Sequence, residues 1–140
     1  MSYTLLLADN NTDFLSVTAE LLRANHYQVF AVGTPREARQ ILVEQHVDVA
    51  ILDIRLLDDG DERDTSGLRL AREMETMLSW GVYVPKIMLT QVQSFEYARQ
   101  ALRPQQQSRA IASNYVTKQE GFEALLTAVR QAIAIDPVRL

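Results

Sequence analysis

Short apolar runs separated by longer helical stretches are the feature that most constrains what this chain can fold into. The runs are Leu5–Ala8, Tyr27–Val32, Val47–Leu52, Ile87–Leu89 and Tyr115–Thr117. Apolar runs this short, bounded by helical stretches, are typical of buried parallel strands. Strands that alternate with helices predict an α/β fold, a doubly wound five-stranded parallel sheet with helices on both faces. Each crossover is expected to be right-handed.

Helix signals occur in the segments between the runs. Thr34–Glu37 is a capping box with proline at the first helical position, which predicts a helix that ends at about Glu44. Asn11 or Thr12 is expected to cap an earlier helix. The apolar face predicted for that helix consists of Phe14, Val17 and Leu21. Three more helices are expected, at about Ser66–Ser79, Ser94–Arg103 and Gly121–Ile135.

Composition limits the function classes. With 140 residues, 47% of them hydrophobic, the chain is expected to form one domain, residues 1–140, with no output domain. A formal charge of −4 and the absence of a basic stripe argue against a nucleic-acid partner. The lack of cysteine excludes disulfides and thiolate metal sites. Neither a signal peptide nor a membrane span is apparent, so a cytoplasmic protein without a membrane partner is expected.

Asp9, Asp53, Thr90 and Lys118 each follow directly on an apolar run. The carboxyl ends of parallel strands lie along one sheet edge, where ligands of open α/β folds bind, so we expect these four residues to converge. Two carboxylates brought together repel each other and bind a metal to relieve the repulsion. Mg²⁺ prefers hard oxygen ligands, and lysine supplies a movable point charge suited to a phosphate. This edge is therefore predicted to bind a divalent cation and a phosphoryl group.

Taken alone, Asp9 or Asp53 has a simpler interpretation as a helix cap or turn residue. Other polar residues also have simpler interpretations. Lys86 starts its run and is interpreted as a lysine that extends to solvent. His26 and His46 precede strands and are interpreted as turn residues at the opposite edge of the sheet. The acidic segment Leu57–Thr65 lacks the spacing of a calcium loop and is interpreted as a solvated, mobile insertion.

In combination these segments resemble the receiver domain of bacterial two-component response regulators, over essentially the whole chain. Leu5–Asn10 is similar to that family's first strand and acidic pair, and Asp48–Leu56 to the strand that leads to its phosphorylated aspartate. Lys86–Thr90 is similar to the strand with the switch threonine, and Asn114–Lys118 to the strand with the aromatic switch residue and the lysine. The resemblance implies a flavodoxin-like, receiver-type sheet of order 2-1-3-4-5.

The resemblance also implies a role for each residue of the site. Asp53 would be the phosphoacceptor, attacking a phosphohistidine of a partner histidine kinase or phosphotransfer protein. The cofactor would be Mg²⁺, held by Asp9, Asn10, Asp53 and the backbone carbonyl of Arg55. Lys118 and Thr90 would contact phosphoryl oxygens, and Tyr115 would turn inward when Thr90 moves. The protein would catalyse only its own phosphorylation and dephosphorylation.

Four positions depart from the family pattern. Asn10 stands where a second carboxylate is usual, so a weaker metal site is expected. Gln91 replaces a small residue after the switch threonine, and Leu57 replaces a proline. Gln119 replaces a proline whose preceding bond is often cis; because a cis bond before Gln would cost about 3 kcal/mol, a trans bond is expected here.

The leading hypothesis is a phospho-accepting signalling switch of a two-component phosphorelay. An alternative is a receiver-like protein-binding module that does not need phosphorylation, motivated by Asn10, Gln91 and Gln119. An enzyme or flavin carrier on the same fold is a third class, disfavoured because Asn11 stands where an aspartyl-phosphate hydrolase would need its second aspartate.

A downstream protein or a second copy of the chain is expected on the face made by the fourth helix, fifth strand and fifth helix. Two features motivate this expectation: Tyr115 lies three residues before Lys118, and the last helix carries alanines at every fourth position. The alanines are Ala124, Ala128 and Ala132. The alternative is that alanine was simply favoured there as a helix former.

Overall fold

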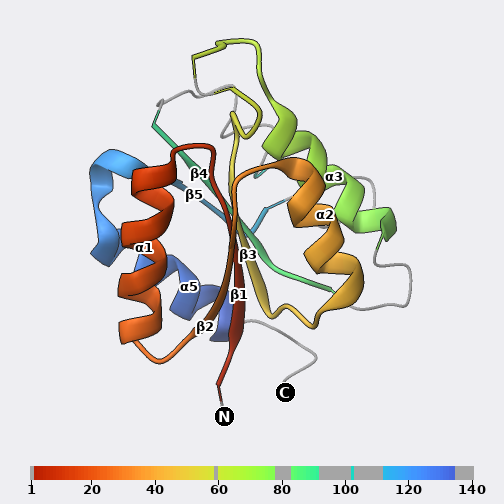
Figure 1. The fold of residues 1–140 in the computed structure, drawn as a ribbon. Coiled ribbons are helices and arrows are strands. Elements are labelled where there is room, and N and C mark those ends of the chain that lie inside the picture. Colours follow the sequence, from red (N-terminus) through yellow and green to blue (C-terminus); the bar gives the residue numbers. More distant parts are fainter. Residues whose placement is uncertain (1, 59, 78–82, 92–101, 103–111, 135–140) are drawn as a thin grey trace.

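A five-stranded parallel sheet forms the centre of the computed structural model, which describes residues 2–58, 60–77, 83–91, 102 and 112–134. The strands are β1 (Thr4–Ala8), β2 (Gln28–Val32), β3 (Val49–Asp53), β4 (Lys86–Thr90) and β5 (Asn114–Thr117). The helices are α1 (Thr12–Ala24), α2 (Pro35–Glu44), α3 (Ser66–Met77), α5 (Phe122–Ala134) and the single-turn η1 (Lys118–Glu120). The order β2-β1-β3-β4-β5 confirms the predicted topology (Figure 1). The helix predicted over residues 94–103 lies outside the described residues, apart from Leu102.

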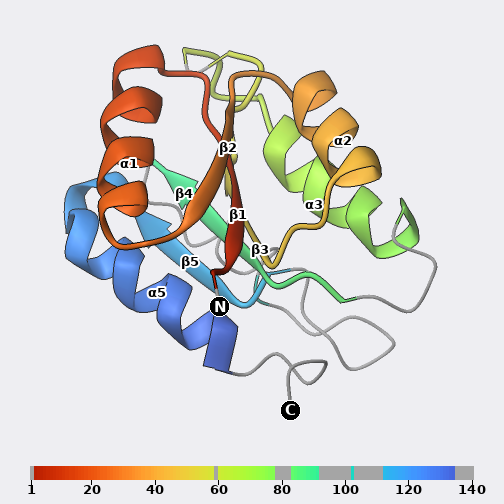
Figure 2. The same cartoon turned by 60° about the horizontal axis from the view of Figure 1, so that its bottom comes forward.

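Successive residues of each strand face opposite sides of the sheet. In β1, Leu6 and Ala8 belong to the apolar cluster under α2 and α3, whereas Leu5 and Leu7 belong to the cluster under α1 and α5. Figures 1 and 2 show the same division from two directions, with α1 and α5 over one face and α2 and α3 over the other. Because both faces are covered, the strands read as continuous apolar runs in the sequence.

Two helix starts are set by the residues that the sequence indicated. The side-chain oxygen of Asn11 accepts the backbone N–H of Phe14 at 3.0 Å, so Asn11 is the N-cap of α1. Thr34 Oγ1 accepts the N–H of Glu37 at 3.1 Å, and Pro35 is the first residue of α2. None of the described helices is long and apolar enough to cross a lipid bilayer.

The apolar face predicted for α1 is partly wrong. The residues of α1 that are buried are Thr18, Ala19 and Leu22. Val17 is 56% exposed and Leu21 is 40% exposed. Thr18 and Ala19 are small, which allows α1 to lie close to the sheet, and the larger Val17 and Leu21 instead line a groove that also receives residues of α5.

The alanine stripe of α5 lies against the sheet. Ala128 and Ala132 are each 2% exposed and belong to the cluster under α1 and α5, and Ala124 packs against that cluster. The interpretation of the stripe as a partner surface is therefore wrong, because its small side chains serve close packing of α5 on the sheet. The fourth helix of the predicted partner face lies outside the described residues, so the face itself stays a prediction.

Lys86 is buried, not directed to solvent as predicted. Its side chain at the start of β4 is 2% exposed, and its Nζ lies 2.7 Å from Oε1 of Glu75 on α3. The ammonium also donates to the carbonyl of Val84 at 3.3 Å. A buried charge requires such pairing. The interpretation of Lys86 as a solvent-directed lysine failed because its partner carboxylate, Glu75, lies on α3, and the sequence alone does not show that α3 places it beside the start of β4.

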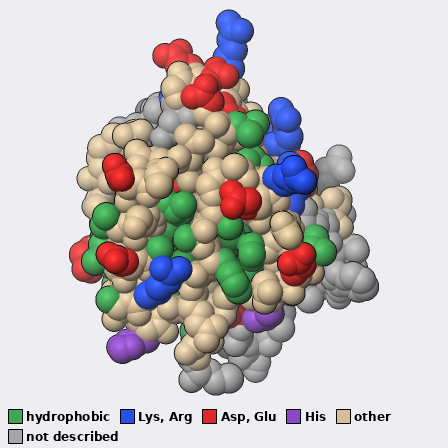
Figure 3. All heavy atoms as spheres, viewed as in Figure 1, with side chains coloured by type: hydrophobic (Ala, Val, Ile, Leu, Met, Phe, Trp, Pro, Cys, Tyr) green, Lys and Arg blue, Asp and Glu red, His purple; other side chains and the backbone are tan. Residues whose placement is uncertain are grey.

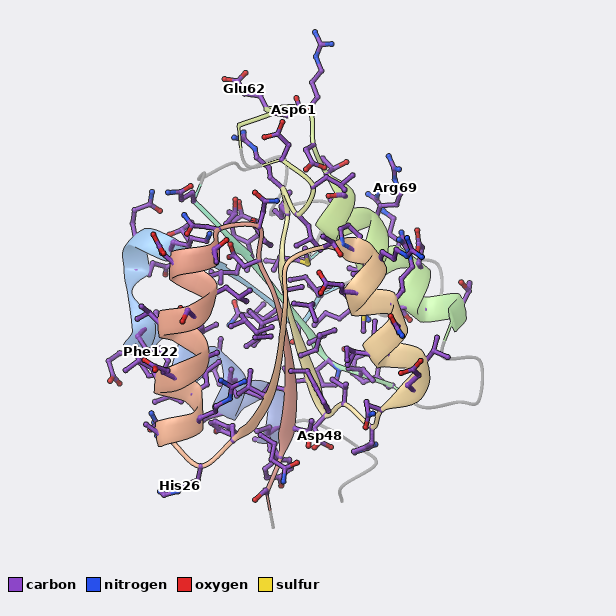
Figure 4. The ribbon with its side chains drawn as sticks, in the orientation of Figure 1. His26, Asp48, Asp61, Glu62, Arg69 and Phe122 are labelled. Carbon is purple, nitrogen blue, oxygen red and sulfur yellow. The ribbon has the colours of Figure 1, made fainter. Side chains whose placement is uncertain are left out.

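The amino-terminal edge of the sheet carries the two histidines, as predicted. His26 adopts a positive φ of 73°, which marks a tight turn before β2. His46 Nε2 lies 2.8 Å from Oδ1 of Asp48, whose other carboxylate oxygen accepts the N–H of Thr4 at 2.8 Å. In Figure 4, His26 and Asp48 lie at the end of the molecule opposite to Asp61.

Candidate functional site

Asp9 and Asp53 lie side by side at the carboxyl ends of β1 and β3, the upper edge of the sheet in Figure 1. The residues that precede them are register partners, so both aspartates leave adjacent strands at the same level. Asp9 is 0% exposed and Asp53 is 1% exposed. Asp9 Oδ1 accepts the N–H of Asn11 at 2.8 Å, and Asp53 Oδ1 accepts the N–H of Arg55 at 3.3 Å. These contacts hold each carboxylate on the turn that follows its strand.

Lys118 reaches Asp9 from the end of β5. Its Nζ lies 2.9 Å from Oδ2 and 3.1 Å from Oδ1 of Asp9, and its side chain is 8% exposed. The turn that carries Lys118 is held by Glu120, whose carboxylate accepts the N–H of Thr117 at 2.7 Å and its hydroxyl at 3.1 Å. Gly121 closes the turn with a φ of 89°, a conformation that favours glycine. The structure thus brings an ammonium group to Asp9, on the strand next to the one that ends at Asp53.

Thr90 ends β4 and is 1% exposed. It is the register partner of Thr117, so its position adjoins the strand end that precedes Lys118. Beyond it, Gln119 Nε2 donates to the carbonyl of Gln91 at 2.7 Å. This hydrogen bond joins the loops that follow β4 and β5, and the proline usual in the family has no donor to make it. No cis peptide bond occurs in the described part of the chain, so the bond before Gln119 is trans, as expected.

Tyr115 lies in the middle of β5 and is half-buried. It packs against the apolar cluster under α2 and α3, whereas the next residue, Val116, belongs to the cluster on the other face. The predicted aromatic switch residue is therefore partly in the core in this structure, and part of it remains accessible.

The oxygen donors at this edge fit a magnesium ion. Asp9 and Asp53 supply two buried carboxylates, and the turn after β3 supplies the backbone carbonyl of Arg55. Mg²⁺ is typically held by one or two carboxylates and keeps several waters. Among the described residues no cluster of three or more His, Cys, Asp or Glu could hold a metal, and the two carboxylates at this edge are those of Asp9 and Asp53. Asn10 is exposed, and its Nδ2 donates to the carbonyl of Leu57 at 3.1 Å.

Gly67 is a structural residue of the site that the sequence analysis did not single out. A Cβ at this position would lie 1.7 Å from the backbone oxygen of Asp53 and 2.7 Å from its carbonyl carbon. The N–H of Gly67 donates to the carbonyl of Ile54 at 2.9 Å, so α3 starts directly against the turn after β3. The only sequence signal was a glycine inside a predicted helix, where it costs about 1 kcal/mol relative to alanine.

The acidic loop between β3 and α3 is organised around Asp64. Its Oδ2 accepts the N–H groups of Leu57 at 2.9 Å and Asp58 at 2.7 Å, and its Oδ1 accepts the N–H of Ser66 at 2.9 Å. Burial alone would raise the pKa of Asp64, but the hydrogen bonds from Asp58, Ser66 and Leu57 outweigh it and hold the pKa below 3.8. This carboxylate therefore closes the base of the loop.

The outer part of the loop is solvated. Asp58, Asp61 and Glu62 are exposed. Figure 3 shows acidic side chains gathered at the top of the molecule, and Figure 4 shows Asp61 and Glu62 projecting from the loop there. The exposure agrees with the predicted solvated insertion, which lies at the same end of the sheet as Asp53.

The model of the response regulator receiver domain matches residues 5–130 of the chain. The chain belongs to this family. Each of the predicted site residues of this receiver domain, from Asp9 to Lys118, falls inside the matched segment. A comparison with curated protein sequences found no match.

Solved structures share the fold of this receiver domain. A CheY-like response regulator receiver domain protein from Methanospirillum hungatei JF-1 is 21% identical, with a TM-score of 0.80 and all of both chains covered. A receiver domain protein from Clostridium thermocellum is 21% identical, with a TM-score of 0.78 and 99% of each chain covered. A response regulator from Burkholderia pseudomallei, solved with a phosphorylated aspartic acid and a calcium ion, is 22% identical with a TM-score of 0.73; the match covers 95% of this chain and 69% of that one.

Proposed function

We propose that this receiver domain is a phospho-accepting switch of a two-component phosphorelay. An oxygen of the Asp53 carboxylate attacks the phosphorus of a phosphohistidine on a partner histidine kinase or phosphotransfer protein. The new O–P bond forms as the P–N bond breaks, and the imidazole leaves with the bonding electrons. The observation that carries this proposal is the placement of the Lys118 ammonium, 2.9 Å from Asp9 at the strand end beside Asp53.

The groups around Asp53 suit a phosphoryl group that arrives and leaves. The phosphoryl group adds about −1.5 to −2 charge, and the ammonium of Lys118, 2.9 Å from Asp9, is the nearby positive charge that would offset it. Thr90, buried at the end of β4, supplies a hydroxyl donor. Movement of Thr90 toward the phosphoryl group makes room for Tyr115, and this changes the face on which a downstream protein or a second copy binds.

Magnesium is the proposed cofactor. When bound, it reduces the repulsion between the phosphoryl oxygens and the carboxylates of the site. Asp9, Asp53 and the carbonyl of Arg55 are the residues that would hold it, with Asn10 as a neutral addition. Both carboxylate oxygens of Asp9 contact Lys118, so at least one of these contacts would have to break for Asp9 to bind the metal.

Phosphoryl uptake tests the proposal directly. Wild-type protein treated with acetyl phosphate and Mg²⁺ should gain the mass of one phosphoryl group in intact-protein mass spectrometry. Asp53→Asn should gain none, because the amide keeps the shape of the side chain but is not a carboxylate nucleophile. Asp61→Asn, an exposed aspartate in the neighbouring loop, is the control and should label normally. Equal labelling of Asp53→Asn and wild type would refute the role of Asp53.

One contact favours a second candidate function, a protein-binding module that works without phosphorylation. The amide of Asn10, which replaces a charged metal ligand, is hydrogen-bonded to the Leu57 carbonyl at 3.1 Å. This bond stabilises the loop in the absence of metal. If folded wild-type protein gains no phosphoryl group and binds its partners equally well with and without the phosphate mimic beryllofluoride, this second function is the correct one.

A further inference from the structure

The ammonium of Lys118 has a second neighbour besides Asp9. Its Nζ lies 4.2 Å from the centroid of the Phe14 ring. An ammonium has three donors and no acceptor. The carboxylate of Asp9 engages it through both oxygens, and the negative face of the ring provides a further attractive surface for the cation. Lys118 is thus held between a carboxylate and an aromatic ring.

Phe14 is itself held in place by the start of α1. Its backbone N–H donates to the side chain of Asn11, the N-cap, at 3.0 Å. The N–H of Asn11 in turn donates to Asp9 at 2.8 Å. The carboxylate and the ring that contact the ammonium therefore lie on one short segment, from Asp9 to the first turn of α1, whose backbone is held by local hydrogen bonds.

The ring also lies at the border between the site and a groove. Phe14 and Lys118 both line a groove of about 370 Å³ between α1 and α5, whose other walls include Leu21, Phe122 and Leu125. Removal of the ring would widen this groove at the ammonium and admit water to it. A hydrated ammonium interacts less strongly with Asp9, because the higher local dielectric weakens the attraction.

We propose that Phe14 is the positioning residue that holds the Lys118 ammonium at Asp9 and thereby sets the rate of phosphoryl uptake. The second half of this statement rests on the proposed function, whereas the first half does not. Phe14 touches neither the phosphoryl donor nor Asp53 in this proposal; it acts through Lys118. A leucine at this position keeps apolar packing on the half-buried α1 surface but has no ring face for the cation.

The position of the ammonium can be measured without any phosphorylation. Only Lys86 and Lys118 are lysines, so protein labelled with ¹³C-lysine gives two sets of ε-methylene signals, and Lys118→Arg identifies the one to follow. Protons above an aromatic face are shifted upfield by the ring current. The Lys118 ε-methylene signal should be upfield in wild type, return toward its ordinary position in Phe14→Leu, and stay upfield in Phe14→Tyr, which keeps a ring.

Phosphoryl uptake from acetyl phosphate supplies the second measurement. Phe14→Leu should slow uptake roughly two- to fivefold, the factor expected from losing one partly exposed cation–π contact, and Phe14→Tyr should restore it. Phe122→Leu is the matched control, because Phe122 also carries a phenyl ring that lines this groove and packs against the same apolar cluster. Its Lys118 ε-methylene signal and its rate of phosphoryl uptake should both match those of wild type.

Two results would overturn the proposal. One is an unchanged Lys118 signal in Phe14→Leu, which would mean that the ring does not hold the ammonium. The other is the same rate of phosphoryl uptake in Phe14→Leu and Phe122→Leu, whether slowed or not, which would leave Phe14 with a packing role only. If wild type takes up no phosphoryl group, the proposed function fails, and the ε-methylene signal still decides where Phe14 places Lys118.

Discussion

Lys118 and Asp9 are 109 positions apart in the sequence, and the ammonium of one lies 2.9 Å and 3.1 Å from the two carboxylate oxygens of the other. The cation of the site therefore neutralises a residue that is also proposed to hold the metal. Two positive charges next to one carboxylate compete for it. Metal binding and the position of Lys118 should be coupled.

Lys118→Met should tighten Mg²⁺ binding and slow phosphoryl uptake at the same time. Removal of the ammonium removes its repulsion of the divalent ion, and after partial cancellation by solvent screening we expect about a tenfold gain in affinity. Isothermal titration calorimetry measures the affinity, and acetyl phosphate labelling measures uptake. Lys118→Arg keeps the charge and should bind Mg²⁺ like wild type. Weaker Mg²⁺ binding by Lys118→Met would show that the lysine supports the metal site instead of competing with it.

Asn10→Asp should bind Mg²⁺ about fivefold more tightly than wild type, a gain near 1 kcal/mol. A charged ligand replaces a neutral one, but repulsion from Asp9 and Asp53 cancels much of the benefit. The hydrogen bond from Asn10 to the Leu57 carbonyl is lost in this variant. Asn10→Ala loses the same bond without adding charge, so the difference between the two variants isolates the charge. Equal affinities in wild type and Asn10→Asp would place residue 10 outside the ligands of the metal.

Gly67→Ala should destabilise the fold by about 3 kcal/mol, because the new Cβ would overlap the backbone of Asp53 and force the chain to shift. Urea unfolding gives the change in the free energy of unfolding. Gly33→Ala is the control: the nearest atom outside its neighbours is 3.8 Å from the added Cβ, and little change is expected. A Gly67→Ala variant as stable as Gly33→Ala would mean that α3 can move away from Asp53 at no cost.

Asp64→Asn should lower stability near neutral pH and make less difference in acid. Hydrogen bonds hold the pKa of Asp64 in the folded protein below its ordinary value of 3.8. A lowered pKa contributes stability that is present above pH 3.8 and is lost as the pH falls through the folded-state pKa. Urea midpoints of wild type and Asp64→Asn should therefore differ at pH 7 and converge as the pH falls through the folded-state pKa of Asp64, which lies below 3.8. Asp61→Asn, on the exposed part of the loop, should show no such convergence, and the same pH profile in both variants would remove Asp64 from its structural role.

The strand and helix pattern could be predicted because it depends on local signals. The apolar runs that became β1 and β3 are buried on both faces, and the caps at Asn11 and Thr34 act within three residues. The edge at which Asp9 and Asp53 meet followed from topology, because parallel strands place their carboxyl ends together. These inferences needed no knowledge of side-chain packing.

What failed depended on contacts between distant segments. Lys86 alone reads as a surface lysine, and only the placement of Glu75 on α3 makes its burial possible. The alanines of α5 read equally well as a surface, since spacing alone does not state which face of a helix meets the sheet. The ring of Phe14 read as ordinary core, because its contact with Lys118 requires two strand ends to come together.

The narrow base of the acidic loop has a practical consequence. The Gly67 N–H bound to the Ile54 carbonyl, and the Leu57 N–H bound to the Ser66 hydroxyl at 2.9 Å, close the loop before its exposed part begins. Extra residues placed beyond this closure add only loop entropy, about 0.6 kcal/mol for each doubling of length. The position between Gly60 and Asp61 is therefore suited to carrying an epitope or a fluorescent reporter. Such an insertion would lie at the end of the sheet where β3 ends at Asp53, without taking the place of any residue that forms the pocket.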